Sequence, residues 1–186
     1  MMLKMDKDTH TYDIDGRRAP SVTQVLADLL PGWQADAWYL QRGTAVHACA
    51  AMIARDESFS YDPQIAGQVA NIRRFFSEIQ PEIIAVELPV CHVRHRYAGT
   101  LDLVARIKGQ IVVIDWKSSV SHSAPYQLAA YALAYDAQNK IQCGYAVAIT
   151  TKTYRIHQYD LREYRAGWLA LLNAYHIRRK CGISGE

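Results

Sequence analysis

Two aspartates and a lysine stand out because each is attached to an apolar segment. Residues 111–114 read Ile-Val-Val-Ile, a run typical of a strand buried on both faces, and Asp115 and Lys117 follow it at once. A carboxylate and an ammonium at the end of a buried strand must be paired or must hold a charged ligand. Asp102 lies in the preceding apolar segment, and a Lys-Gly turn signal separates the two. The spacing predicts a β-hairpin that sets Asp102 beside Asp115.

Neighbouring carboxylates of this kind indicate a cation site. Two ionised acids a few ångströms apart repel each other unless a cation lies between them. Mg²⁺ and Mn²⁺ prefer oxygen ligands, so we expect Asp102 and Asp115 to bind one or two such ions. Glu87 interrupts another apolar run, residues 83–90. A buried glutamate needs a partner or a function, so Glu87 is a further candidate.

Two expected helices carry polar residues that could approach this hairpin. We expect a helix break at Gly43 and a new helix over residues 45–54, where His47 lies beside an apolar stripe. From the residues alone, His47 can be explained as a structural histidine at the edge of the hydrophobic core. Gln127 and Tyr131 are four residues apart on a helix opened by a proline, so they share one face. That face either leans over the site or belongs to an amphipathic surface helix.

Three arginines are candidate phosphate contacts. Arg73 lies in an amphipathic helix expected over residues 64–79. Arg94 and Arg96 lie at the tip of a basic hairpin. Lys and Arg that face a nucleic-acid backbone neutralise its phosphates. Solvent exposure explains each of these arginines as well as a phosphate contact does.

The order of these motifs resembles the PD-(D/E)XK nuclease superfamily, and within it the RecB-like exonuclease branch of phage and bacterial single-domain members. The resemblance rests on an acid, then Asp-x-Lys one strand later, preceded by Arg-Gly-Thr-x-x-His at 42–47 and followed by Gln-Leu-x-x-Tyr at 127–131. It runs from Tyr12 to about Tyr159. It implies an α/β fold with a central mixed β-sheet of the restriction-endonuclease-like type, flanked by helices, and a helical N-terminal part that carries the histidine.

The resemblance also implies roles for residues. The metal ligands would be His47, Asp102, Asp115 and the backbone carbonyl of Trp116. The implied catalytic residues are Asp102, Asp115, Lys117, Glu87, Gln127 and Tyr131. The candidate DNA contacts are Arg42, Arg73, Arg94, Arg96 and Ser118.

The implied activity is Mg²⁺- or Mn²⁺-dependent hydrolysis of DNA phosphodiesters. We expect an exonuclease that acts on single-stranded or end-exposed DNA in recombination, repair or phage DNA processing. No G-x-x-x-x-G-K motif occurs, so any unwinding must come from a helicase or recombination partner. Some relatives hold an iron–sulfur cluster through cysteines near the C-terminus. Because only Cys181 lies there, and the four cysteines include no C-x-x-C pair, we expect no such cluster.

Length and composition are those of an ordinary globular protein. The 186 residues predict one nuclease domain, with a mainly helical part at 1–80, a catalytic sheet and Gln-x-x-x-Tyr helix at 81–160, and a C-terminal helix at 161–186. The net charge of +3 permits a nucleic-acid partner without arguing for one.

No apolar run approaches the roughly 20 residues that span a bilayer, and the first residues lack a signal-peptide core. We expect a cytoplasmic protein, in a bacterium or a phage-infected host, with no membrane partner.

Two alternatives stay open at this stage. The same fold could serve as a catalytically silent DNA-binding or scaffolding subunit, although degenerate members usually lose an acid or the lysine, and all are present here. The second alternative is a metal-dependent hydrolase of a small phosphoester, for which the sequence shows no dedicated pocket signature.

Overall fold

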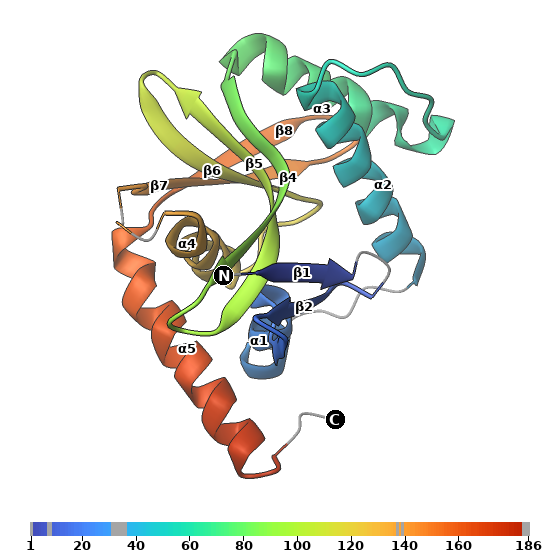
Figure 1. Cartoon of the computed structure of the whole chain (residues 1–186). Helices are drawn as coiled ribbons and strands as arrows, with labels where there is room; N and C mark the ends of the chain where they lie inside the picture. The colour runs from blue at the N-terminus through green and yellow to red at the C-terminus, as the bar shows by residue number, and fades with distance from the viewer. Residues whose placement is uncertain (1, 7–8, 31–36, 137, 139, 184–186) are drawn as a thin grey trace.

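The computed structural model describes residues 2–6, 9–30, 37–136, 138 and 140–183, with the backbone alone at 37–40. A five-stranded mixed sheet forms the centre, helices cover both of its faces, and a small three-stranded sheet lies beside it (Figure 1). The expected α/β class, with a mixed sheet flanked by helices, is confirmed. No helix in the described part of the chain is long and apolar enough to span a membrane.

The small sheet is N-terminal and antiparallel, in the order β1-β2-β3. Its strands are β1 (Leu3–Asp6), β2 (Thr11–Ile14) and β3 (Arg17–Ala19). The turn between β2 and β3 consists of Asp15 and Gly16, which both have positive φ, 50° and 75°. Such a two-residue turn matches the twist of the strands that it joins.

Helix α1 (Val22–Leu29) has Ser21 as its N-cap residue. The Ser21 side chain accepts a hydrogen bond from the Gln24 backbone, and the Gln24 side chain accepts one from the Ser21 backbone. This reciprocal pair is a capping box, and it fixes where the chain turns from β3 into the helix. The Pro31-Gly32 pair, which the sequence predicts to end this helix, lies outside the described residues.

Helix α2 (Ala37–Ala54) runs without interruption through Gly43. The prediction of a helix break at Gly43, followed by a new helix from about residue 45, is therefore wrong. A glycine inside a helix costs only about 0.5–1 kcal/mol relative to alanine. The apolar residues that follow, Val46, Cys49 and Ala50, are buried against α3, and this packing outweighs the cost.

The central sheet follows α3 (Ala66–Ile79), which begins after a short 3₁₀ turn, η1 (Pro63–Ile65). Its strands are β4 (Glu82–His92), β5 (Tyr97–Ile107), β6 (Gln110–Lys117), β7 (Cys143–Ile149) and β8 (Tyr154–Asp160). Their order is β4-β5-β6-β7-β8, and every neighbouring pair is antiparallel except β6 and β7. Parallel strands need a crossover, and α4 (Ala124–Tyr135) supplies it.

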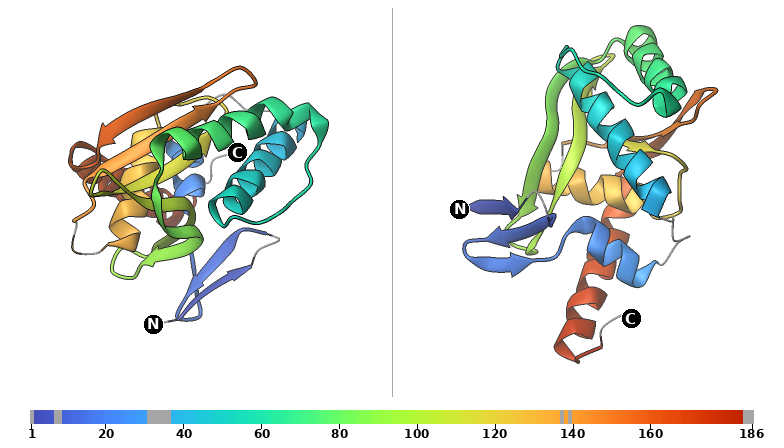
Figure 2. Two further views of the ribbon diagram at one scale, coloured as in Figure 1. Left: turned by 90° about the horizontal axis from the view of Figure 1, so that it is seen from above. Right: turned by 90° about the vertical axis from the view of Figure 1, so that its right-hand side faces the viewer.

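The sheet lies between two groups of helices (Figures 1 and 2), and an apolar cluster fills the space on each face. Helices α1, α4 and α5 (Arg162–Lys180) cover one face, with Leu128 and Trp168 fully buried. Helices α2 and α3 cover the other face, where the ring of Phe75 packs edge-on against Trp116 at 5.1 Å between centroids. The middle of β6 is buried from both sides, as its apolar run predicted. This burial is what isolates the acids described next from bulk water.

Candidate active site

The predicted hairpin sets Asp102 and Asp115 side by side. Leu103 of β5 pairs with Ile114 of β6, so Asp102 and Asp115 come next in the antiparallel register. Both are buried, at 9% and 2% exposure. The backbone N–H of Trp116 donates a hydrogen bond to Asp102 Oδ2 at 2.8 Å. The metal-binding role suggested for the Trp116 carbonyl stays a prediction.

Glu87 continues this row of acids onto β4. Val86 and Leu88 pair with the residues on either side of Asp102, so Glu87 lies opposite Asp102. Its φ of 49° is in the left-handed region, which costs an ordinary residue about 1–2 kcal/mol. Strained backbone of this kind clusters at functional sites. Burial and the charge of Asp102 raise the pKa of Glu87 to about 7.

Helix α2 brings His47 to the same row. His47 Nδ1 lies 3.3 Å from Asp102 Oδ2, and the His47 side chain is 33% exposed. Burial alone would lower the pKa of His47, but the charges of Asp102 and Asp115 outweigh it and raise the pKa to about 9. In return, the charge of His47 holds the pKa of Asp102 below its usual value in spite of burial. Without a metal, the imidazolium is therefore the counter-ion of Asp102.

Lys117, Asp115 and the α4 residues form a second buried group. Lys117 Nζ lies 2.7 Å from Asp115 Oδ2 and donates to Gln127 Oε1 at 2.9 Å. Gln127 Nε2 donates to Asp115 Oδ1 at 3.0 Å and to the Tyr131 hydroxyl oxygen at 3.3 Å. Burial opposes the charge on Lys117, but Asp115 outweighs it and raises the pKa of the ammonium. The shared face predicted for Gln127 and Tyr131 therefore leans over the strand acids.

The donor set fits a divalent cation. One ligand atom from each of His47, Glu87 and Asp102 lies within 4.8 Å of the others. Among the described residues, Asp115 is not part of this trio; its two oxygens contact Lys117 and Gln127. Two carboxylates and an imidazole suit Mn²⁺ and are acceptable for Mg²⁺. Glu87, a further candidate from the sequence, therefore lies with His47 and Asp102 in the candidate cation site.

All these groups face one cavity of about 670 Å³. Its wall includes residues that the sequence did not single out, among them Tyr12 and Arg55. The Tyr12 hydroxyl shares a hydrogen bond of 2.9 Å with Thr100 Oγ1, and Arg55 Nη2 donates to the Val86 carbonyl at 3.3 Å. The Tyr12 contact joins residues 88 positions apart, so no local pattern could have indicated it. We call this cavity the catalytic cleft.

The candidate DNA contacts separate into three places. Arg42 and Ser118 line a cavity of about 330 Å³ that shares His47 and Lys117 with the catalytic cleft. The guanidinium of Arg73 stacks over the ring of Phe59 at 5.4 Å on α3, away from the strand acids. The other two candidates, Arg94 and Arg96, lie at the turn between β4 and β5 and line a different pocket.

Curated relatives and solved structures resemble this chain over part or most of its length. Mitochondrial genome maintenance exonuclease 1 of Mus musculus is 31% identical over 131 residues, which are 61% of this chain and 38% of that protein. The Homo sapiens protein of the same name is 26% identical over 132 residues, 62% of this chain and 38% of its own length. The matched region therefore spans less than half of these relatives.

Among solved structures, the alkaline exonuclease LHK-Exo from Laribacter hongkongensis matches with 12% identity and a TM-score of 0.42, over 88% of this chain and 93% of that chain. The structure of LHK-Exo in complex with dAMP matches with 11% identity and a TM-score of 0.45, over the same shares. The family model of the PD-(D/E)XK nuclease superfamily matches residues 63–171, which hold the strand acids, the lysine and the α4 residues. Since this match covers more than half of the chain, the protein belongs to the PD-(D/E)XK nuclease superfamily.

Proposed function

We propose that this protein is a divalent-metal-dependent deoxyribonuclease, and specifically an exonuclease that acts on single-stranded or end-exposed DNA. The observation that carries the proposal is the row of Glu87, Asp102 and Asp115 across three strands, with His47 and Lys117 beside it in one cleft. The curated relatives are named as exonucleases, which supports the same activity. Recombination, repair or phage DNA processing in the cytoplasm is the setting we propose.

In this proposal His47, Glu87 and Asp102 would hold the cation, and Asp115 on the neighbouring strand would complete the donor set. A divalent ion there would offset phosphate charge and make a water molecule more acidic. The Trp116 N–H fixes one oxygen of Asp102, which leaves less freedom for that carboxylate. Groups held this way act without reorganising at the moment of reaction.

We assign to Lys117 the role of contacting the scissile phosphate and orienting the attacking water. Asp115 and Gln127 hold its ammonium from two directions, so the charge is fixed at the wall of the cleft. An ammonium so placed attracts a phosphate oxygen and orients a water next to it. Tyr131 in turn anchors Gln127, so that α4 sets the position of the lysine.

The test is a time course on DNA labelled at the 5′ or 3′ end, single-stranded and double-stranded, with a closed circle as control. With Mg²⁺ or Mn²⁺ we expect progressive loss of linear DNA and an intact circle. The first label released gives the polarity. Cleavage that persists in EDTA would contradict the metal dependence, and a cut circle would exclude a strict exonuclease.

The silent-subunit alternative predicts a different result in the same assay. It requires DNA to remain intact under every metal condition. A small-phosphoester hydrolase would also spare DNA but would cleave members of a nucleotide panel. The complete set of acids, lysine and histidine in one cleft favours the nuclease over both.

A further inference from the structure

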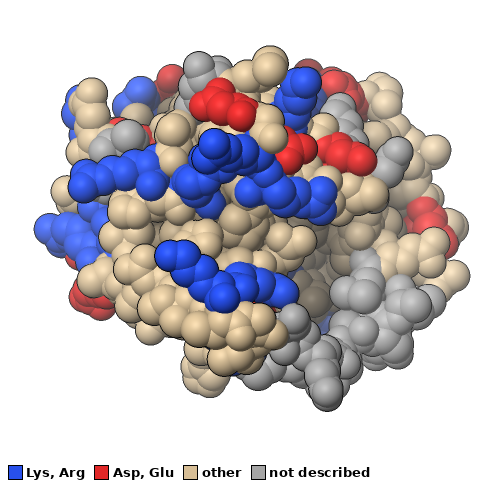
Figure 3. Space-filling model, turned by 60° about the horizontal axis from the view of Figure 1, so that its bottom comes forward, with Lys and Arg blue, Asp and Glu red and all other residues tan. Residues whose placement is uncertain are grey.

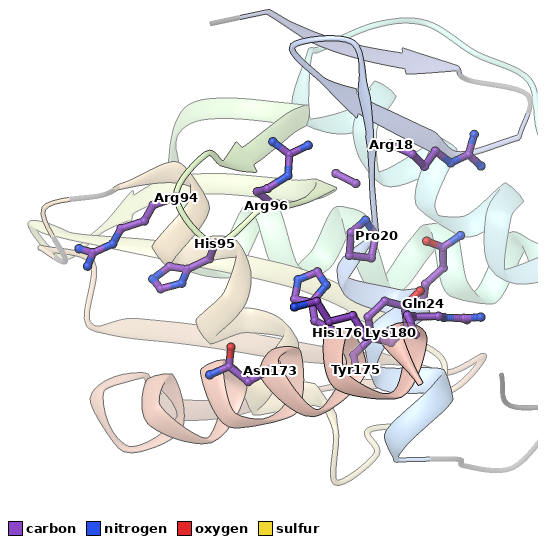
Figure 4. Close-up of a pocket in the computed structure, with 12 residues that line it drawn as sticks. Arg18, Pro20, Gln24, Arg94, His95, Arg96, Asn173, Tyr175, His176 and Lys180 are labelled. Atoms are coloured by element: carbon purple, nitrogen blue, oxygen red, sulfur yellow. The ribbon is translucent and has the colours of Figure 1, made fainter. Parts of the chain in front are cut away.

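A third cavity, about 790 Å³ in volume, lies at the end of the molecule formed by the β4–β5 turn and the C-terminal end of α5 (Figure 4). Its cationic wall residues are Arg18, Arg94, Arg96, Arg179 and Lys180, and we call this cavity the basic pocket. Among the described residues, no aspartate or glutamate lines it. Figure 3 shows Lys and Arg side chains gathered in bands on this side of the molecule.

The five cations come from three separate segments. Arg18 lies on β3, Arg94 and Arg96 lie in the turn between β4 and β5, and Arg179 and Lys180 lie in the last turn of α5. Cations at the end of a helix offset its dipole, which accounts for the α5 pair alone. The convergence of the other two segments on the same cavity needs another explanation.

The charges of the basic pocket are also left uncompensated. The neighbouring Arg178 does have a counter-ion, since its Nε lies 3.1 Å from Asp28 Oδ2. In the part of the chain that the structure describes, none of the five pocket cations forms a salt bridge. Like charges around one cavity repel each other and attract anions. Arg179 is further held over the ring of Tyr175, at 5.0 Å, which orients its guanidinium.

The basic pocket adjoins the catalytic cleft. The start of α1 separates them, because Pro20 and Gln24 line the pocket whereas Ser21 and Thr23 line the cleft. From the start of β5 to Asp102 is five residues, or about 17 Å at about 3.3 Å per residue. That length equals about five steps along one strand of a B-form duplex, at 3.4 Å each. A polymer in the cleft can therefore reach the pocket.

We propose that the basic pocket binds the phosphate backbone of the DNA strand whose scissile bond lies in the catalytic cleft, about five nucleotides away. This inference rests on the proposed nuclease function. Guanidinium groups bind phosphate through paired N–H donors, and they do so without reading sequence. The concave shape of the basic pocket and its closeness to the catalytic cleft favour a DNA strand over an anionic membrane surface.

The test compares two pairs of substitutions that remove equal charge. Arg94→Gln with Arg96→Gln alters the pocket, and Lys108→Gln with Arg155→Gln is the matched control. Lys108 lies in the turn at the opposite end of β5, and Arg155 is exposed on β8. Binding of a labelled single-stranded oligonucleotide, long enough to span both cavities, is measured by anisotropy in EDTA across a salt series.

For the pocket pair we expect about tenfold weaker binding, and a salt slope reduced by about 1.4, which is 0.7 for each lost phosphate contact. The preference of the enzyme for the long oligonucleotide over a dinucleotide should shrink by a similar factor. The control pair should bind as the wild type does. A second pair, Arg18→Gln with Lys180→Gln, removes charge from the other two walls and should repeat the result.

Three outcomes would overturn the inference. The pocket and control pairs could weaken binding equally, which would indicate a general charge effect. The second outcome is that both pocket pairs are folded, as thermal unfolding would show, and yet neither pair changes the salt slope. The third outcome is that the wild type binds phosphatidylserine vesicles and the pocket pairs do not, while the pocket pairs bind DNA as tightly as the wild type does. A wild type that cleaves no DNA would refute the proposed function instead, so the two failures are distinguishable.

Discussion

The catalytic cleft and the basic pocket hold charge in opposite ways. In the cleft, charges of both signs are buried and paired, as with Lys117 and Asp115 at 2.7 Å. In the basic pocket, charges of one sign lie on β3, on the β4–β5 turn and at the end of α5, and none of them forms a salt bridge among the described residues. Buried charges must be paired to be tolerated, whereas exposed ones need no partner. Under the proposed function, the cleft carries out the hydrolysis and the basic pocket binds the substrate strand.

The largest effect should come from breaking the paired charges of the cleft. Asp115→Asn and Lys117→Ala should each lower DNA cleavage at least about a thousandfold, because each removes charge fixed at the reacting phosphate. Binding of DNA in the absence of a metal should change little, since the basic pocket is intact. Single-turnover cleavage and anisotropy measure the two quantities. Cleavage that survives in both variants would remove the cleft from the mechanism.

The next effect concerns the metal. His47→Ala should weaken Mn²⁺ binding by at least about 10–100-fold, because it removes one of the three donors that lie together. Isothermal titration calorimetry gives the affinity and the stoichiometry. His122→Ala is the matched control, since His122 is exposed in the loop after β6. A wild type without a stoichiometric Mn²⁺ site would support the silent-subunit alternative.

The smallest effect tests the helix that carries His47. Gly43→Ala should stabilise the protein by about 0.5–1 kcal/mol, because Gly43 lies inside α2 and a Cβ there would meet no atom within 4 Å. Gly109→Ala is the control with the opposite sign, since Gly109 has a φ of 80° and alanine would be strained there. Thermal unfolding reports both changes. If Gly43→Ala destabilised the protein instead, the result would support the helix break at Gly43 that the sequence predicted.

Local rules predicted the cleft better than the pocket. The apolar run of β6 and the turn that precedes it were sufficient to place Asp115 beside Asp102, because strand period and turn chemistry act over a few residues. The positive φ of Glu87 and the contact of Tyr12 with Thr100 depend on distant neighbours. The break expected at Gly43 failed because packing outweighs a weak local propensity.

The basic pocket shows the same limit more strongly. Arg94 and Arg96 could be recognised as a basic turn, but their convergence with Arg18 and the end of α5 joins the beginning, middle and end of the chain. No periodicity in the sequence records that meeting. A cluster assembled from distant segments becomes visible only when the fold has brought them together.

The most direct measurement of the central claim is anomalous diffraction from crystals grown with Mn²⁺. We predict a peak in coordinating contact with His47 and Asp102, and its loss in crystals of Asp102→Asn. Manganese bound elsewhere, with the acids of the cleft still paired to His47 and Lys117, would contradict the account.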